Sequence, residues 1–564
     1  MARKSLSDEE IRMILAEELY NNSSEDEIED DDYIPSDDDG EIDEIVPALD
    51  ISDEEADDYQ SIAEQTLAAN ENPQMSFTSK NKTENWTSNP QSDSEGRLRI
   101  HNIVREKSGP TRYAIRNVDD IASAFSLFFR DSLLQEICTF TNIEGDFKLK
   151  DRWKQLDIEE LKKFIATLLL IGVYKSKGEP VHQLWSKDDG RPIFNAIFAR
   201  NRFQEILRMM RFDNACERRQ NRSPDKLQPI RKIFDLWNST LQDAFIPGVN
   251  LTVDEQLLTF RGRCPFRQYI PSKPGKYGIK FWVICDSETS YALKLDIYKG
   301  KEPSEQRASN LGTTVVLNLS DSYKNSGRNI TCDNFFTSLQ LGRELLRRKL
   351  TLVGTIRKNR TELPTAFTVT KGRKLFSSMY GFQRDSTIVS YCPKKNKVVT
   401  LLSTMHNDKG IESPGETKPE IIQYYNSTKG GVDTMDQMVR YYSTKRMTRR
   451  WPMVVFFNMI DISAMNAIII WIKLQTSLQC KKGVRRALLI TLAKSLAGVT
   501  ANNNPPLQKP VSSNSSLASE NTNKRKRCYL CPSKKDRKSK IYCDDCQQSI
   551  CGEHSVNICL QCKK

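Results

Sequence analysis

The chain has 564 residues and a formal net charge of +11, which suggests several domains and a polyanionic partner. Residues 1–60 hold 24 acidic against three basic side chains, a net charge of −21, so the remainder carries +32. The N-terminus is acidic and lacks an apolar stretch, which argues against a signal peptide. Seven of the 14 cysteines lie in the last 37 residues, a pattern that excludes a disulfide scaffold and favours one local metal site.

Residues 1–102 are acidic and then rich in Ser, Asn, Thr and Gln, so they are predicted to form a disordered tail. From residue 103 to 249 apolar residues recur at helical spacing. One helix begins with a capping signature, in which Glu160 follows Asp157 by three residues. The helices are predicted at Ile121–Cys138, Asp157–Tyr174, Arg202–Phe212 and Pro229–Phe245.

Beyond Val249 the hydrophobic period changes from that of helices to that of strands. Residues 250–359 are predicted to form a mixed α/β domain, which an insertion at 360–419 interrupts and residues 420–442 complete. Its strands are predicted at Leu251–Phe260, Gly278–Asp286, Tyr291–Tyr298, Asn329–Asp333 and Thr351–Ile356, with a helix at Thr337–Arg348. Strand-like pieces of the insertion occur at Thr387–Tyr391 and Val398–Ser403.

Residues 443–498 return to helical spacing and contain one long apolar segment, Trp451–Ile472. Polar residues lie near its middle, and among them Asp461 would cost about 3 kcal/mol at a bilayer centre. We therefore expect a buried core helix and no membrane span. A Pro/Asn/Ser-rich linker, residues 499–527, ends in a basic KRKR run that reads either as a nuclear localisation signal or as a plain basic linker.

Four aspartates occupy special positions in the predicted core. Asp254 lies within an apolar strand, Asp333 ends a strand where a helix begins, and Asp433 and Asp436 share one face of a later helix. Carboxylates are the ligands that Mg²⁺ prefers, and two such ions can stabilise both oxygens of a phosphodiester displacement. The order of strand, strand-end and helix acids is that of an RNase H-like nuclease core.

Other readings of these acids stay open. Asp433 could simply complement a helix dipole, and a two-carboxylate glycosidase would leave the basic body and the cysteines unexplained. Asp286 is better explained as a turn residue, and Asp296 lies in the same region. Glu255 alternates to the strand face opposite Asp254, so we expect it outside the site.

Basic residues follow the first catalytic strand and precede the apolar helix, where they could neutralise DNA phosphates or be solvated loop residues. An arginine beside an aromatic ring can support an unstacked base, which makes Trp451 a candidate; the alternative is an apolar anchor. The candidates for DNA contact are Arg261, Arg263, Arg267, Lys273, Lys276, Lys280, Lys445, Arg446, Arg449, Arg450 and Trp451, with Lys534, Lys535, Arg537, Lys538 and Lys540 in the tail.

The tail, residues 528–564, contains four short pairs of metal-ligating side chains, enough for two tetrahedral Zn²⁺ ions. So short a segment has no room for a hydrophobic core, so metal must hold it together. Alternation of the pairs suggests a cross-brace with Cys528, Cys531, Cys551 and His554 on one ion and Cys543, Cys546, Cys559 and Cys562 on the other. Cross-brace modules also serve as ubiquitin ligases or histone-tail readers, so the fold does not define the partner.

Several long motifs in the right order resemble the piggyBac-type DNA transposases: VDEQLLTFRGRCPFRQYIPSKPGKYGIK, NITCDNFFTS, YYNSTKGGVDTMDQM and RRWPM. The resemblance runs from about His101 to Trp471 and resumes in the cysteine-rich tail. It implies an RNase H-like core with a metal-binding triad of Asp254, Asp333 and Asp433 and a further family acid, Asp436. It also implies a tryptophan, Trp451, near a flipped hairpin base and a tail that binds transposon ends.

The sequence therefore predicts a multidomain α+β protein. Its RNase H-like mixed α/β core carries an insertion domain and is wrapped by an all-helical dimerisation and DNA-binding domain. We expect a nuclear, homodimeric cut-and-paste transposase that uses Mg²⁺ or Mn²⁺, forms hairpin intermediates at double-stranded terminal inverted repeats and integrates at TTAA. The alternatives are a domesticated transposase-derived protein that binds DNA or chromatin without catalysis, and a ubiquitin ligase or histone reader built on the zinc tail.

Overall fold

The computed structural model divides the chain into two compact units, residues 1–501 and 502–564, each of which is considered by itself. In the first unit it describes residues 75–90, 104, 106–221, 224–271, 273, 275–300, 310–409, 418–475 and 483–499. In the second it describes residues 526–527, 531, 538–539, 541–542 and 549–551, which include short strand pairs of β14 (Lys526–Arg527) with β15 (Lys538–Ser539) and β16 (Ile541–Tyr542) with β17 (Ser549–Ile550).

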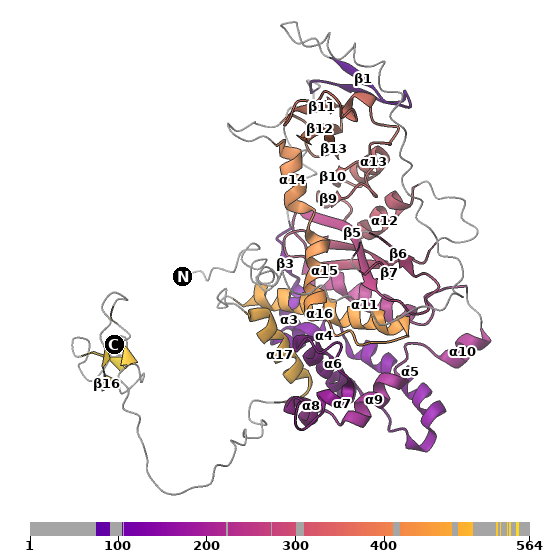
Figure 1. Ribbon diagram of the computed structural model, residues 1–564, viewed down its shortest axis with the longest axis vertical. Helices are drawn as coiled ribbons and strands as arrows, with labels where there is room; N and C mark the ends of the chain where they lie inside the picture. The colour runs from indigo at the N-terminus through magenta and orange to yellow at the C-terminus, as the bar shows by residue number, and fades with distance from the viewer. Residues whose placement is uncertain are drawn as a thin grey trace. The chain divides into compact units, whose positions relative to one another are not determined.

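One mixed sheet organises the first unit, in the order β1-β2-β11-β12-β13-β10-β9-β5-β7-β6, with β8 also paired to β7 (Figure 1). The central strands β5, β9 and β10 are mutually parallel and are flanked by antiparallel β7 and β13. The strands are β1 Ser76–Thr78, β2 Asn85–Thr87, β5 Asn250–Thr259, β6 Gln268–Tyr269, β7 Tyr277–Asp286, β8 Ala292–Ile297, β9 Asn329–Cys332, β10 Thr351–Thr355, β11 Ser378–Phe382, β12 Thr387–Lys394 and β13 Lys397–Ser403.

Most of the helices lie on the side of the sheet that holds β5 and β7 (Figure 1). There α16 packs against α4, α15 and α17, and α15 also contacts β5. A small strand pair, β3 (Gly109–Pro110) with β4 (Phe245–Ile246), closes the first helical segment. The helices are α3 Arg112–Asn117, α4 Ile121–Ser126, α5 Asp131–Leu149, α6 Ile158–Val173, α7 Val181–Leu184, α8 Pro192–Ile197, α9 Arg200–Met209, α10 Ala215–Gln220, α11 Arg231–Asp243, α12 Leu311–Leu319, α13 Leu339–Arg347, α14 Glu420–Thr428, α15 Gly431–Tyr441, α16 Trp451–Leu474 and α17 Val484–Leu496.

The expected core helix is α16. It is long and apolar enough to cross a membrane, yet the apolar window is fully buried within the protein. Its polar side chains have partners in neighbouring elements: Asp461 accepts from the Thr444 backbone N–H at 2.9 Å, and Ser463 accepts from the indole N–H of Trp237 at 2.8 Å. Because buried polar groups with hydrogen-bond partners cost little, the prediction of a core helix is confirmed.

Local signals predicted most elements of the described core within a few residues. Asp157 caps α6 by accepting from the Glu160 backbone N–H at 2.7 Å, as its capping signature indicated. The helix predicted at Ile121–Cys138 is instead two helices, α4 and α5, separated by residues 127–130. Several elements were not predicted, among them the short helices α7, α8 and α10, the helix α12 and the strand β11.

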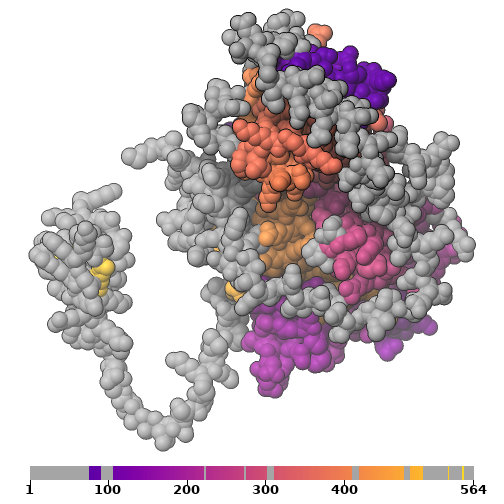
Figure 2. All heavy atoms as spheres, turned by 45° about the horizontal axis from the view of Figure 1, so that its top comes forward, coloured from indigo at the N-terminus to yellow at the C-terminus, as the bar shows by residue number. Residues whose placement is uncertain are grey.

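The prediction that residues 1–102 form a disordered tail is wrong for residues 75–90. These residues form a β1–β2 hairpin that pairs with β11 of the insertion, and Figure 2 shows it, in indigo, lying over the insertion segment. Trp86 is completely buried there, although its neighbours in sequence are polar. Trp86 belongs to the hydrophobic core, and Phe77 packs edge-to-face on Phe367 with centroids 5.2 Å apart, so distant segments supply the apolar contacts that order this polar hairpin. Residues 1–74 lie outside the described residues.

Candidate active site

Asp254 and Asp333 lie side by side because their strands are parallel neighbours. Val253 of β5 pairs in register with Cys332 of β9, and each aspartate is the next residue along its strand. The carboxyl ends of parallel strands meet at one edge of a sheet, which is where α/β proteins bind ligands. Both side chains are partly exposed at this edge.

Asp433 comes from the first turn of α15, which packs against β5 at a glycine. A Cβ atom at Gly431 would lie 2.6 Å from Oγ1 of Thr252, which is too close for any side chain. That oxygen is held in place because it donates to the Thr428 carbonyl at 2.7 Å and contacts the Ser287 hydroxyl at 2.7 Å. The glycine therefore lets α15 approach β5 closely enough to bring the exposed Asp433 beside the strand acids.

Electrostatics show that the three carboxylates share one region. Burial, together with the charges of Asp333 and Asp433, raises the pKa of Asp254 to about 7, although a backbone hydrogen bond from Glu255 opposes the shift. Burial also raises the pKa of Asp333, to which the charge of Glu255 adds. Within the part of the chain that the structure describes, no ion pair relieves Asp254, Asp333 or Asp433. A cation is the physical remedy for such a cluster.

The three carboxylates do not by themselves form a closed metal site. Among the described residues no group of three acidic, cysteine or histidine side chains lies close enough to enclose a metal ion. Mg²⁺ is usually held by one or two carboxylates together with water and substrate phosphates. The hard oxygen donors of Asp254, Asp333 and Asp433 therefore suit a divalent ion that a substrate would help to bind.

Asp436 is positioned differently from the other three acids. Its Oδ1 accepts from the Gln256 side-chain amide at 2.9 Å, and its Oδ2 pairs with Arg440 at 2.7 Å, one helical turn away. Burial raises its pKa, while Arg440 opposes that shift. Because both oxygens have protein partners, Asp436 links α15 to β5 through Gln256, and its assignment as a catalytic residue stays a prediction.

Glu255 points to the opposite strand face, as expected, yet it is not electrostatically remote from the site. Its Oε2 lies 2.6 Å from Nζ of Lys280, and its charge raises the pKa values of both Asp254 and Asp333. Lys280 is almost completely buried by this pairing. The ammonium group of Lys280 neutralises Glu255, so a DNA contact of Lys280 would first require this ion pair to break, and that contact stays a prediction.

Several of the predicted DNA contacts have intramolecular partners instead. Arg446 is buried and donates to the carbonyls of Ser176 at 2.6 Å and Glu179 at 2.7 Å, and Arg450 donates to that of Met210 at 2.8 Å. These groups join the segment before α16 to the helical region. Lys445 likewise donates to the Thr259 carbonyl, and Arg267 to that of Arg261 at 2.7 Å.

The structure favours the apolar-anchor alternative for Trp451. The side chain is buried, and its ring packs edge-to-face on Phe266 with centroids 5.0 Å apart. In the DNA-free protein Trp451 is thus an apolar anchor at the start of α16, and its stacking on a base stays a prediction. The predicted contacts with exposed side chains are Arg261, Arg263, Lys276 and Arg449, with Lys273 partly exposed.

Arg357 was not predicted as part of the site. It is exposed just after β10, its charge lowers the pKa of Asp333, and its Nε donates to Oδ1 of Asn334 at 3.2 Å. With Phe335 and Arg360 it lines a cleft of about 450 Å³. The sequence did hold a signal for Arg357. Because β10 is parallel to β9, the residues that follow β10 lie at the same edge of the sheet as Asp333, which follows β9.

Most of the predicted zinc ligands lie outside the described residues: Cys528, Cys543, Cys546, His554, Cys559 and Cys562, as do Lys534, Lys535, Arg537 and Lys540. For Lys538 only the backbone is described. The two described ligands, Cys531 and Cys551, have sulfur atoms 3.7 Å apart. Two thiolates on one tetrahedral zinc ion, each about 2.3 Å from the metal, stand at about this separation.

Comparison with known proteins places the chain in a family. Residues 121–468 match the family described as Transposase IS4. Human PiggyBac transposable element-derived protein 3 is 24% identical over 357 residues, which cover 59% of this chain and 58% of that protein. Human PiggyBac transposable element-derived protein 2 is 21% identical over 365 residues, covering 61% and 60%. The match thus spans less than two thirds of either human relative.

A solved structure is more similar. It is a piggyBac transposase in a synaptic complex with hairpin DNA, determined by cryo-electron microscopy, and it is 36% identical to this chain. The superposition has a TM-score of 0.66 and covers 81% of this chain and all of that one. The mixed α/β fold, the order of its motifs and these matches together show that the chain belongs to the piggyBac-type transposase family.

Proposed function

We propose that the protein is an active cut-and-paste DNA transposase whose strand cleavage and strand transfer occur at Asp254, Asp333 and Asp433. The observation that carries the proposal is the gathering of these three carboxylates at one sheet edge without an ion pair among the described residues, with the pKa of Asp254 raised to about 7. An arrangement that costs free energy in the free protein is typical of a functional site.

Two divalent ions, Mg²⁺ or Mn²⁺, fit the donor set, because carboxylates are hard oxygen ligands and the cluster needs positive charge. When bound, such ions would supply Lewis acidity for phosphoryl transfer. Asp254, Asp333 and Asp433 would hold them. Asp436 and Gln256 would keep α15 in place on β5, so that Asp433 stays beside the strand acids.

The chain's other residues would bind and orient the DNA. Arg357 lies next to Asp333, and the exposed Arg261, Arg263 and Lys276 follow β5, so a backbone crossing this edge would meet positive charge. The relative with a solved structure was captured in a synaptic complex with hairpin DNA. By likeness to it we propose hairpin intermediates and paired transposon ends, and from the family resemblance we propose a homodimer, TTAA targets and action in the nucleus.

The cysteine-rich tail is proposed to bind two zinc ions and transposon-end DNA. The 3.7 Å approach of Cys531 and Cys551 supports placing these two ligands on one ion, as the cross-brace requires. Removal of zinc by a chelator should then unfold the tail and weaken end binding. Atomic absorption of the full chain, with two zinc ions per chain expected, tests the metal directly; fewer than one would contradict the cross-brace.

The test of catalysis is an excision and joining assay with the full chain, Mg²⁺ and a donor DNA carrying the terminal sequences that flank its own gene. Wild type should release the element. Asp333→Ala should lose at least about a thousandfold in rate, because it removes one member of a group that acts as a unit. The matched control is Asp151→Ala, which removes an exposed acid of the helical region and should cleave like wild type.

The second candidate function is DNA or chromatin binding without catalysis. It is favoured by the names of the human relatives, which are transposable element-derived proteins. The same assay separates the two: specific binding of the terminal sequences with no Mg²⁺-dependent cleavage by wild type would establish this alternative and overturn the proposal of an active transposase.

A further inference from the structure

The β1–β2 hairpin (residues 75–90) touches a loop next to the candidate active site. The backbone N–H of Lys80 donates to the Leu363 carbonyl at 3.1 Å, and that of Asn81 donates to the Thr361 carbonyl at 3.1 Å. The side chain of Lys80 also donates to the Lys358 carbonyl. Each partner belongs to residues 357–363, which follow β10, here named the β10 loop. The hairpin therefore satisfies carbonyl groups along most of this loop.

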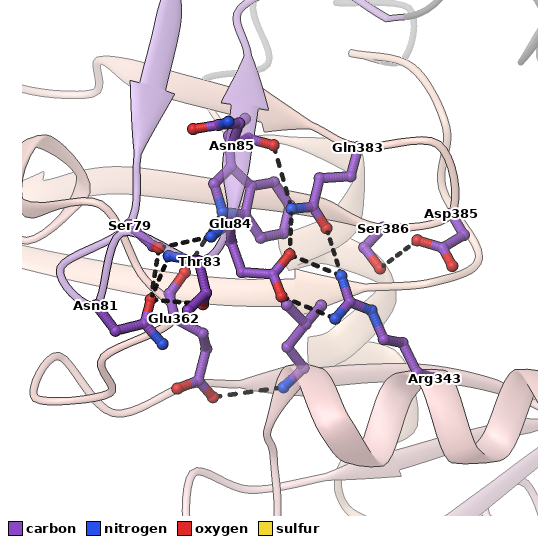
Figure 3. A network of polar contacts seen from close by, with 12 residues as sticks. Ser79, Asn81, Thr83, Glu84, Asn85, Arg343, Glu362, Gln383, Asp385 and Ser386 are labelled. Atoms are coloured by element: carbon purple, nitrogen blue, oxygen red, sulfur yellow. Dashed lines mark hydrogen bonds and ion pairs between the residues drawn. The ribbon is translucent and has the colours of Figure 1, made fainter.

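The hairpin is anchored by a buried aromatic ring and an ion pair. Trp86 is completely buried, and its indole N–H points to the Glu362 carbonyl at 3.4 Å. Glu84 forms a two-pronged pair with Arg343 of α13, with contacts of 2.8 and 2.7 Å, and accepts from the Gln383 amide at 2.9 Å (Figure 3). Hydrogen bonding from Arg343 lowers the pKa of Glu84, so this carboxylate is charged at neutral pH.

The other side of the β10 loop faces the catalytic edge. Arg357 begins the loop and donates to Asn334, the residue after Asp333. Arg357, Arg360, Thr361 and Glu362 line the cleft of about 450 Å³ with Phe335. Within the loop, two turn hydrogen bonds link Arg360 to Arg357 and Leu363 to Arg360, at 3.1 and 3.4 Å. Such bonds shape a turn, the buried Leu363 side chain and the Leu339 N–H bond to Glu362 at 3.5 Å attach its far end, and the hairpin adds bonds to its carbonyl groups.

We propose that the β1–β2 hairpin is a positioning latch, which holds the β10 loop and Arg357 against the catalytic edge through the Glu84–Arg343 pair. The inference rests on the proposed function, because it assigns the latch an effect on the strand-cleavage rate. Glu84 and Arg343 touch neither metal ligands nor the cleft, so they are positioning residues. A segment about 270 residues upstream in sequence thereby helps to complete the site.

The experiment compares full-length Glu84→Ala and Arg343→Ala with the exchanged double variant Glu84→Arg/Arg343→Glu. Glu84→Gln, which keeps a hydrogen-bond acceptor, is the second variant should Glu84→Ala fail to fold. The control is Glu136→Ala, which breaks a 2.8 Å ion pair with Lys232 far along the chain from the hairpin. Amide hydrogen exchange is followed in peptides covering residues 80–86 and 357–363. The cleavage rate at saturating DNA and the Kd for the same DNA without metal are measured alongside.

Glu84→Ala and Arg343→Ala should exchange faster in both peptides and cleave about tenfold more slowly, because displacing groups beside a reacting centre costs rate. Their Kd values should stay within about twofold of wild type, and the exchanged pair should recover most of the missing rate, since it restores the interaction. A purely structural role would not separate rate from affinity in this way.

Two results would overturn the latch: unchanged exchange in residues 357–363 of a folded Glu84→Ala, or a cleavage rate equal to that of Glu136→Ala. Wild type that does not cleave its own ends contradicts the proposed function instead. In that case exchange in residues 357–363 alone decides whether the hairpin holds the loop, so the two proposals fail separately.

Discussion

Two regions of the molecule were predicted to bind ligands from the charges of their side chains. Among the residues that the structure describes, the charges of one region lack ion-pair partners, whereas those of the other have hydrogen-bond partners. At the carboxylate edge, Asp254, Asp333 and Asp433 gather although their charges repel, and no ion pair relieves them within the described residues. In the basic segment before α16, Arg446 and Arg450 each find carbonyl partners of the helical region. The carboxylate cluster therefore costs electrostatic free energy in the free protein, whereas the arginines of the basic segment have their hydrogen-bonding groups paired.

The difference separates ligand binding from folding. A charged side chain that is already hydrogen-bonded and buried would have to break those bonds to meet a ligand, so it contributes to stability first. Carboxylates that crowd one another without a partner destabilise the free protein, and a bound cation would remove that cost. Residue type therefore indicates which side chains could bind a ligand, and the intramolecular partners of each side chain show which of them are available to do so.

The largest change in activity is expected for Asp254→Asn, which tests whether the carboxylate cluster costs free energy in the free protein. Asp254→Asn should abolish cleavage, with a loss of at least about a thousandfold. It should also stabilise the metal-free protein at pH 8. The raised pKa, about 7, means that ionising Asp254 costs free energy in the folded state, so wild-type stability falls as pH rises from about 4 to 7 and then levels off. Asparagine does not ionise and avoids that loss.

Thermal unfolding with EDTA at pH 5 and pH 8 tests whether stability falls with rising pH in wild type and falls less in Asp254→Asn. The wild type should lose more stability than the variant between these values. An exposed acid, changed as Asp188→Asn, provides the control and should follow wild type. Equal pH dependence in wild type and Asp254→Asn would show that the carboxylates do not strain the free protein.

Next in size is Arg446→Ala, which should reduce the free energy of unfolding by roughly 3 kcal/mol, because the buried carbonyls that it serves would be left without their donor. The exposed Arg449, three residues on, is the matched control, and Arg449→Ala should change stability by less than about 0.5 kcal/mol. Urea unfolding measures both. An Arg446→Ala variant that is as stable as wild type but no longer binds DNA would show that Arg446 serves DNA binding rather than folding.

A smaller effect is expected at Gly431, where α15 meets β5. Gly431→Ala should cost about 1–3 kcal/mol, since the new methyl group would overlap Oγ1 of Thr252, which its hydrogen bonds hold in place. It should also slow cleavage by moving Asp433. The double change Gly431→Ala/Thr252→Ala should recover part of the stability if overlap is the cause; no recovery would point to backbone strain instead.

The smallest effects are expected for the exposed basic residues. Arg263→Ala and Lys276→Ala should leave stability unchanged and weaken DNA binding a few-fold. Each should also reduce the slope of log K against log[salt] by about 1, because one DNA phosphate is no longer neutralised by the protein. Binding titrations at several salt concentrations give the slope. Unchanged slopes for both variants would remove residues 261–280 from the DNA-binding surface.

Much of the candidate site could be predicted because its signals lie within short stretches of sequence. Asp254 stands out in an apolar strand, Asp333 ends a strand, and the two glycines before Asp433 mark the start of α15. Hydrophobic period and capping signals depend on residues a few positions apart, so the strands and α6 could be placed from the chain alone. The family resemblance then assigned the acids to one site.

Only the tertiary structure decided which charges are neutralised inside the protein. Lys280 meets Glu255 across two strands, and Arg446 meets carbonyls some 270 residues away in sequence. The order of residues 75–90 depends in the same way on a groove that accepts Trp86. These outcomes are interactions between distant segments, and their free energy exists only once the sheet has brought the segments together. Local sequence therefore predicted the candidate catalytic acids, whereas long-range packing determined the partners of the basic side chains.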